Sequence, residues 1–262
     1  SSGRLDALTN WYMFTWRPIA STTADHADML GAAAKSLKTR THRVVMAPVP
    51  DEDGSATLIE QAFRAAGWLV QRTRCDSNHI LRPDGRNFAS YLATRPGKLR
   101  TTLSRKSRKL DIQIYSTFYE HIWDTYEKIY ACSWKPAEGN RELLKRFANA
   151  EGHAGRIRLG LALHQGEPVA AQFWTVENGT AFIHKLAHTP ESKPLSAGSV
   201  LTAALFEQVI DRDHVDLVDF GTGNDPYKAD WMEEIRPRYR IDCYNPARVA
   251  SWPHIARAAF QR

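Results

Sequence analysis

The chain has 262 residues, 43% hydrophobic and 24% charged, which is typical of one large or two ordinary globular domains and excludes an intrinsically disordered chain. No apolar run approaches the roughly 20 residues of a membrane-spanning helix, and three scattered cysteines exclude a disulfide framework. The formal net charge of +6 favours an anionic partner: a phosphorylated cofactor, an acidic polymer, nucleic acid or a membrane surface.

Hydrophobic periodicity predicts alternating strands and helices in the first half of the chain. The predicted strands are residues 43–49, 68–74, 78–82 and 111–117. The predicted helices are residues 55–66, 87–94, 97–110, 119–134 and 140–150. The strands at 68–74 and 78–82 are expected to flank a turn.

The second half shows three consecutive strands followed by alternating helices and strands. The predicted strands are residues 156–164, 167–176, 180–188, 215–220 and 238–244. The predicted helices are residues 200–211, residues 227–234 and a segment from residue 252. Gln165-Gly166 and Asn178-Gly179 predict tight hairpin turns. This order predicts an α+β fold, a mixed sheet with flanking helices, and a division into halves 1–130 and 131–262.

Strand 215–220 runs directly into a glycine-rich polar turn. The run reads Asp219-Phe220-Gly221-Thr222-Gly223-Asn224-Asp225-Pro226-Tyr227-Lys228-Ala229-Asp230-Trp231. Such a turn lets a ligand approach the backbone and aims polar side chains at it. Asp219 and Asp225 are candidate general bases, and Lys228 is a candidate for stabilising an oxyanion or holding an anionic substrate. The alternative is that Asn224 or Asp225 caps the next helix and Lys228 forms a surface ion pair.

The turn that precedes helix 200–211 is a candidate phosphate site. It contains Lys193, Leu195, Ser196, Ala197, Gly198 and Ser199. Small residues at a helix start leave backbone N–H groups open, the helix dipole adds partial positive charge, and Lys193 adds a full charge. The alternative is an ordinary serine N-cap followed by a glycine that allows close packing.

Helix 97–110 carries a cluster of positive charges that includes Arg105 and Arg108. The cluster is either a solvated face or a cationic wall that faces an anionic ligand. Three histidines, His164, His184 and His188, lie on adjacent predicted strands, but their spacing does not indicate a metal site. His184 is the best candidate for a base among them, because its strand leads to the candidate phosphate turn.

Taken together, these motifs resemble the acetyltransferase family of cellulose and exopolysaccharide gene clusters, the CelD/BcsL-like group. That group belongs to the GNAT superfamily and is close to the FemAB-type peptidoglycan aminoacyltransferases. The resemblance spans residues 40–245 and rests on the motifs Arg105-Lys106-Ser107-Arg108-Lys109-Leu110, Gly166-Glu167-Pro168-Val169-Ala170-Ala171-Gln172, Ser196-Ala197-Gly198, Asp219-Phe220-Gly221 and Tyr227-Lys228. Of the superfamily's usual phosphate-loop pattern, Gly198 alone matches clearly.

The resemblance implies a tandem GNAT-like fold, with an acceptor-side first half and an acyl-CoA-binding second half. Acyl-CoA, foremost acetyl-CoA, would lie between strands 180–188 and 215–220, with its diphosphate on residues 195–199. We expect direct N-acyl transfer to an amino group of a sugar or cell-envelope precursor, without a metal. Asp219 or His184 would act as the base and Lys228, supported by Tyr227, would stabilise charge. The residues expected to contact the acceptor are Arg105, Arg108, Asn224, Asp225 and Trp231.

Three alternatives stay open. One is a FemAB-like aminoacyltransferase that uses aminoacyl-tRNA, which would make tRNA the nucleic-acid partner. Another is a non-catalytic binding subunit of a polysaccharide-synthesis complex. The third is a basic nucleic-acid-binding protein. In each case we expect a cytoplasmic protein, with peripheral association at the inner face of the cell membrane as a further expectation.

Overall fold

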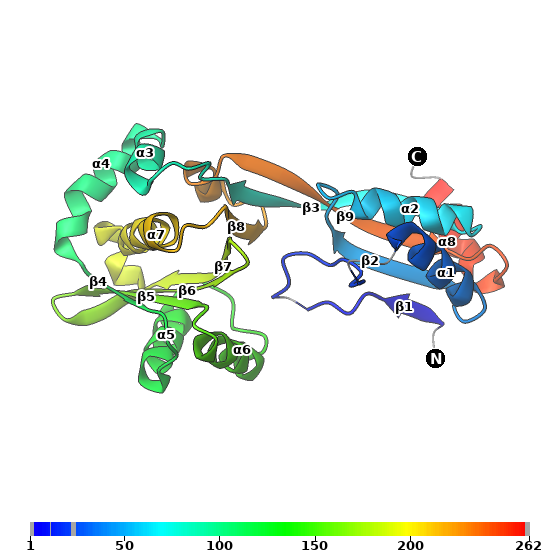
Figure 1. The fold of residues 1–262 in the computed structure, drawn as a ribbon. Coiled ribbons are helices and arrows are strands. Elements are labelled where there is room, and N and C mark those ends of the chain that lie inside the picture. The colour runs from blue at the N-terminus through cyan, green and yellow to red at the C-terminus, as the bar shows by residue number, and fades with distance from the viewer. Residues whose placement is uncertain (1–2, 11, 22–24, 260–262) are drawn as a thin grey trace. The chain divides into compact units, whose positions relative to one another are not determined.

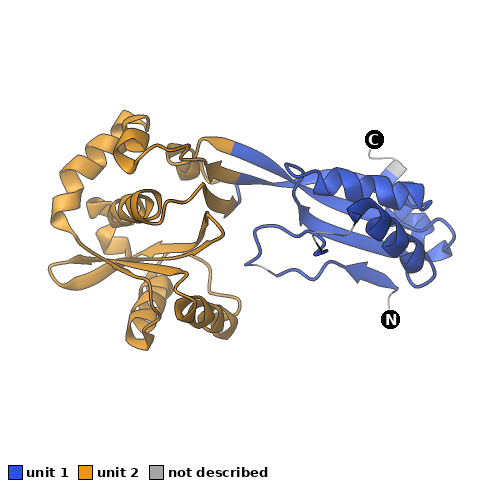
Figure 2. Cartoon of the chain, viewed as in Figure 1, with its two compact units in different colours: residues 1–78, 222–224, 235–262 blue, residues 79–221, 225–234 orange. Residues whose placement is uncertain are grey.

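The structure is a computed structural model that describes residues 3–10, 12–21 and 25–259. The chain forms two units, drawn in blue and orange in Figure 2. Unit 1 consists of residues 1–78, 222–224 and 235–262, and unit 2 of residues 79–221 and 225–234. Unit 1 therefore combines segments that are far apart in the sequence, whereas unit 2 is nearly continuous.

Unit 2 is a sheet covered by helices on both faces (Figure 1). Its strands are β4 (Asp111–Tyr115), β5 (Ile157–His164), β6 (Glu167–Glu177), β7 (Thr180–His188) and β8 (Leu217–Thr222), in the order β8-β7-β6-β5-β4. Its helices are α3 (Phe88–Ala93), α4 (Gly97–Lys106), α5 (Glu120–Cys132), α6 (Arg141–His153) and α7 (Ala197–Glu207). Helices α5 and α6 lie on one face of the sheet and α7 lies on the other, with α4 packed against α7.

Two tight turns set the register of the antiparallel strands in unit 2. Gln165 and Gly166 join β5 to β6, and Asn178 and Gly179 join β6 to β7. All four residues have positive φ, between 49° and 86°. This is the conformation that two-residue hairpin turns with the twist of the flanking strands require. The two predicted hairpins are therefore confirmed.

A buried polar network ties β6 to α7. Gln172 has no exposed surface, and its Nε2 donates to the carbonyl oxygen of Gly198 at 3.0 Å and to Oγ1 of Thr202 at 2.7 Å. Its Oε1 accepts from Nε1 of Trp174 at 2.9 Å. The side-chain amide thus satisfies three polar groups inside an apolar core and fixes the start of α7 against the sheet.

Unit 1 is a smaller sheet with helices. Its strands are β1 (Arg4–Asp6), β2 (Arg43–Val49), β9 (Glu234–Tyr244) and β3 (Leu69–Leu81), in the order β1-β2-β9-β3. Its helices are α1 (His26–Lys38), α2 (Ser55–Ala65) and α8 (Trp252–Ala259). Buried side chains of α1, α2, β2 and β9 form its core. The last residues of β3 and the first residue of β9 belong to unit 2.

The predicted mixed sheet with flanking helices is confirmed, but several details differ. The predicted division after residue 130 falls inside α5, a continuous helix that packs on β6 and β7. The two strands predicted at 68–74 and 78–82 are the single strand β3. The helix predicted at 227–234 is a short 3₁₀ turn, Pro226–Asp230, and β9 begins at Glu234.

Two elements near the start of the chain, β1 and α1, had no predicted counterpart. Helix α1 begins at Asp25, whose side chain accepts hydrogen bonds from the amides of Ala27 and Asp28. None of the helices within the described residues has the length and apolar character needed to cross a membrane.

The Gln172 network predicts a measurable loss of stability when the amide is removed. Gln172→Leu keeps the volume but leaves the Trp174 indole and the Thr202 hydroxyl without this partner. We expect the free energy of unfolding in urea to fall by about 1–3 kcal/mol. The matched control is Gln61→Leu, at an exposed side chain of α2, which is expected to change the free energy of unfolding by less than about 0.5 kcal/mol. Equal changes in the free energy of unfolding of the two variants would contradict a stabilising role of the Gln172 hydrogen bonds.

Candidate functional site

Strands β7 and β8 run parallel but pair over three residues alone. Thr180, Ala181 and Phe182 lie opposite Leu217, Val218 and Asp219. Beyond Phe182 the strand β7 continues to His188, and beyond Asp219 the strand β8 continues to Thr222. The backbone N–H and C=O groups on the β8 side of the second half of β7 are therefore not used in this pairing. Such an opening at strand ends is a place where a ligand can bind to backbone groups.

A β-bulge in β7 coincides with the opening. Phe173 of β6 pairs with Lys185, whereas the next residue, Trp174, pairs with Ile183, so His184 is the additional residue. A bulge bends its strand and increases its local twist. The irregularity therefore gives a physical reason for the divergence of β7 from β8, and it places His184 at the point of divergence.

His184 lies in an aromatic environment beside the bulge. Its ring stacks on Phe173 at 5.0 Å between centroids and meets the ring of Phe147 edge-on at 5.3 Å. Its Nε2 forms a hydrogen bond of 2.8 Å with Oγ1 of Thr175. Burial, together with the nearby charge of Lys185, lowers the pKa of His184 to about 3. The imidazole is therefore neutral at physiological pH but a weak proton acceptor.

Asp219 is the polar residue of the buried strand β8. Its side chain is 3% exposed, and Oδ1 accepts a hydrogen bond of 2.8 Å from the amide of Gly221. Its neighbours Val218 and Phe220 point into the core with α7. Because side chains alternate along a strand, Asp219 faces the α5 and α6 side of the sheet, the side that holds His184. The two candidate bases thus share one face on adjacent strands.

Lys228 and Tyr227 close the end of β8. The Lys228 side chain is 4% exposed, so the alternative of a surface ion pair is wrong. Its Nζ donates to the carbonyl oxygen of Phe220 at 3.1 Å and lies 5.3 Å from the centre of the Phe220 ring. Tyr227 packs edge-on against the same ring. Burial, together with the charge of Asp225, raises the pKa of Tyr227 to about 12, so the phenol keeps its proton.

The start of α7 supplies a group of open amides. Ser196 adopts the left-handed conformation, φ 54°, and its hydroxyl makes no capping hydrogen bond, so the alternative of an ordinary serine N-cap is wrong. Within the described residues, the amides of Ala197, Gly198 and Ser199 have no hydrogen-bond acceptor. Lys193 is exposed one turn earlier. Three aligned N–H groups at a helix start favour an anion such as a phosphate.

The other predicted site residues lie elsewhere. Asn224 belongs to unit 1, whereas Asp225 is exposed and makes no side-chain cap. Trp231 is 3% exposed and stacks on Phe206 in the core of unit 2, so its ring offers no surface to a substrate.

The basic segment is also separate from the other candidate residues. Arg105 and Arg108 are exposed at the end of α4 and in the turn that follows it, just before the edge strand β4. Four strand spacings, about 19 Å, separate β4 from β8. The structure therefore does not bring these two cations to Asp219.

Sequence reasoning missed three contacts near the opening. Thr175 bonds His184, Lys185 of β7 forms an ion pair with Glu138 at 3.0 Å, and Trp134 packs on His188 at 4.4 Å. Threonine in an apolar strand is a weak signal for the first contact. No sequence pattern indicates the other two, because each joins the α5–α6 connection to a strand about 50 residues later.

The arrangement suits the binding of an elongated anionic molecule and the transfer of a group from it. The α7 amides offer an anion site, and the second half of β7 offers backbone groups along an extended chain. Asp219 and His184 offer proton acceptors. In the part of the chain that the structure describes, no group of three His, Cys, Asp or Glu side chains is placed to hold a metal ion.

Solved structures with the same fold are numerous. They include the C-terminal domain of a putative lysylphosphatidylglycerol synthetase from Agrobacterium fabrum, with TM-score 0.63, 12% identity, and coverage of 91% of this chain and 79% of that chain. A conserved protein of unknown function from Bacteroides thetaiotaomicron has TM-score 0.62, 13% identity, and coverage of 85% and 76%. FemX has TM-score 0.59, 13% identity, and coverage of 85% and 78%. At these identities the likeness shows the fold alone.

No curated protein matches the chain by sequence. The acetyltransferase (GNAT) domain profile matches residues 97–229, just over half of the 262 residues. The matched segment contains α4 to α7, β4 to β8, the open amides of α7, and both Asp219 and Lys228. The chain belongs to the acetyltransferase (GNAT) domain family.

Proposed function

We propose that the chain is an acyl-CoA-dependent N-acyltransferase that transfers an acyl group, foremost acetyl, directly to an amine. The observation that carries the proposal is the parting of β7 from β8 next to the open amides of α7. The family membership supports acyl-CoA as the donor class. The acceptor that we propose is an amino group of a sugar or envelope precursor with an anionic group, which fits the net charge of +6.

The residues at the start of α7 fit the diphosphate of an acyl-CoA. Ala197, Gly198 and Ser199 would donate their amides to phosphate oxygens, and Lys193 would add a positive charge. A Cβ on Gly198 would lie 3.3 Å from Cδ2 of the His188 ring, a tight contact that favours glycine at this position. The pantetheine arm would follow the backbone of β7 toward His184.

Transfer in a ternary complex needs a base and a group that stabilises the oxyanion. The acceptor nitrogen attacks the thioester carbon, the carbon–sulfur bond breaks, and the thiolate of CoA takes up a proton. A backbone amide of β7 beyond Phe182 would polarise the carbonyl. Lys228 would add positive charge at the end of β8, with Tyr227 holding the turn.

Asp219 is the stronger of the two candidates for the base. Above about pH 3 His184 is neutral, but an imidazole with so low a pKa binds a proton weakly. Asp219 is a carboxylate on the same face of the sheet, fixed by the Gly221 amide. We therefore assign the proton transfer to Asp219 and a packing role to His184.

Binding of CoA tests the donor site. At 100 times its Kd, CoA should stabilise the protein by about 2.7 kcal/mol, which a thermal-shift assay detects. Lys193→Glu should weaken CoA binding about tenfold or more, because a charge-assisted hydrogen bond contributes about 1.5–3 kcal/mol. Lys109→Glu makes the same charge change at the β4 edge and should leave the Kd unchanged. If neither CoA nor any acyl-CoA raises the melting temperature of the wild type, the assignment of acyl-CoA as the donor is wrong. An aminoacyl-tRNA donor or a non-catalytic role is then favoured.

Kinetics with acetyl-CoA and an amino sugar test the base. Asp219→Asn should lower kcat/KM by about 10²–10⁴-fold, whereas His184→Gln should lower it less than tenfold. Between pH 5 and 8 the His184→Gln variant should keep the pH profile of the wild type, because His184 loses its proton near pH 3. Full activity of both Asp219→Asn and Lys228→Met in folded protein would refute these two assignments.

A further inference from the structure

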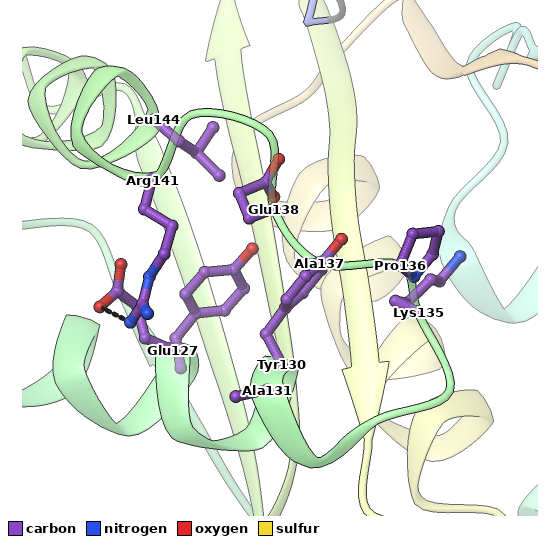
Figure 3. Close-up of a pocket in the computed structure, with 10 residues that line it drawn as sticks. Glu127, Tyr130, Ala131, Lys135, Pro136, Ala137, Glu138, Arg141 and Leu144 are labelled. Carbon is purple, nitrogen blue, oxygen red and sulfur yellow. Dashed lines mark hydrogen bonds and ion pairs between the residues drawn. The ribbon is translucent and has the colours of Figure 1, made fainter.

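A cavity of about 260 Å³ opens between α5, α6 and the segment that joins them, residues 133–140 (Figure 3). The rings of Tyr126 and Tyr130 and the side chain of Leu144 form part of its wall. Sites for drug-sized ligands measure about 300–1,000 Å³, so this cavity suits one sugar ring or a molecule of amino-acid size. It lies in unit 2, on the face of the sheet that holds His184 and Asp219.

Three of the four charged residues that line the cavity are paired. Glu127 forms an ion pair with Arg141 at 2.8 Å, drawn as a dashed line in Figure 3. Glu138 forms an ion pair with Lys185 of β7 at 3.0 Å, and both side chains are largely buried. The fourth residue is Lys135, whose ammonium makes no hydrogen bond or ion pair with any described residue.

Lys135 lies at one end of the group of lining residues drawn in Figure 3, and its neighbour Trp134 packs on His188, the last residue of β7. Figure 3 shows its amine turned away from the Glu127–Arg141 pair. Partial burial lowers its pKa, with a further contribution from Lys185, while the carboxylate of Asp225, in the turn after β8, acts in the opposite direction. The ammonium also lies 5.2 Å from the centre of the Trp134 ring. Because it makes no hydrogen bond or ion pair with a described carboxylate, a bound anion would further stabilise its partly desolvated charge.

The neighbouring residue holds this segment in place. The Trp134 ring packs on His188 at 4.4 Å, and His188 in turn lies against Gly198 at the start of α7. This contact places the backbone of residues 134–135 beside the end of β7, although Trp134 itself is exposed.

We propose that Lys135 selects the acceptor, by holding a phosphate or carboxylate group of an amine-bearing molecule that occupies the cavity. The inference rests on the proposed function, in which the acceptor amine must reach a thioester beside β7. The cavity is formed by α5, α6 and their connection, on the face of the sheet where Asp219 lies, and its Glu138 is ion-paired with Lys185 of β7. An acceptor that is anchored there by its anionic group presents its amine toward the strands.

The anionic group that Lys135 binds belongs to the acceptor and not to the donor. The donor's diphosphate already has three open amides and Lys193. Lys135 instead shares its surroundings with Lys185 and, through it, with Glu138 of the cavity wall. The two sources of the anion are separable, because CoA and the acceptor can be titrated one at a time.

Equilibrium binding without CoA tests the proposal. Glucosamine 6-phosphate and glucosamine are titrated by calorimetry into wild type, Lys135→Ala, Lys135→Arg and the surface control Lys109→Ala. We expect wild type to bind the phosphorylated sugar at least about tenfold more tightly than glucosamine. The preference should disappear in Lys135→Ala and persist in Lys135→Arg and Lys109→Ala. Unchanged melting temperatures establish that the variants are folded.

Two results would overturn the proposal. One is wild type that shows no preference for the phosphorylated sugar, or a preference that survives in Lys135→Ala. The other is a Lys135→Ala variant whose affinity falls for CoA and not for the sugar phosphate, since the anion would then belong to the donor. Failure of the proposed acyl-CoA-dependent function is a separate result. It would appear as a wild-type protein that binds no CoA, whatever the sugar titrations give.

Discussion

The separation of two parallel strands after three paired residues is the constraint on which the site depends. A sheet normally satisfies the backbone groups of a central strand on both sides. Here β7 keeps its β6 partner throughout, while its β8 side is paired over Thr180–Phe182 alone. The bulge at His184 turns β7 away, and the start of α7 follows from where β7 ends. The end of the β7–β8 pairing and the bulge thus lie within three residues of each other, at Phe182 and His184.

Buried polar residues keep that irregularity in a single conformation. Gln172 ties the start of α7 to the sheet, Thr175 forms a hydrogen bond with His184, and Lys228 donates to the Phe220 carbonyl of β8. Each of these groups lies in an apolar environment where an unsatisfied polar atom would be unfavourable by about 1–3 kcal/mol. Gln172, Thr175 and Lys228 are therefore polar side chains at buried positions that apolar side chains would fill in a purely structural core.

Local signals in the sequence predicted the parts of the fold that depend on local chemistry. Asn178-Gly179 predicted a hairpin because few residues adopt positive φ, and the glycine-rich end of β8 predicted a turn. Strand β3 was divided in two because its exposed middle, including Cys75, interrupts the apolar pattern. Trp231 follows a polar turn, which suggested a ligand-facing aromatic side chain, but its ring stacks on Phe206 in the core, a contact that no local pattern indicates. Glu138 and Lys185 meet only after folding, so no local pattern marks the cavity.

The pairing of β2 with β9 has a consequence for how the protein is made. Val44 lies opposite Cys243, so unit 1 can complete its sheet only after the segment through Cys243 has been synthesised. At about 5–20 residues per second, the first strands wait on the order of 10–40 seconds for their partner. The segment 79–221 emerges within that interval and can fold first. During translation the exposed apolar strand β2 is therefore a candidate for chaperone protection, which the folded protein no longer needs.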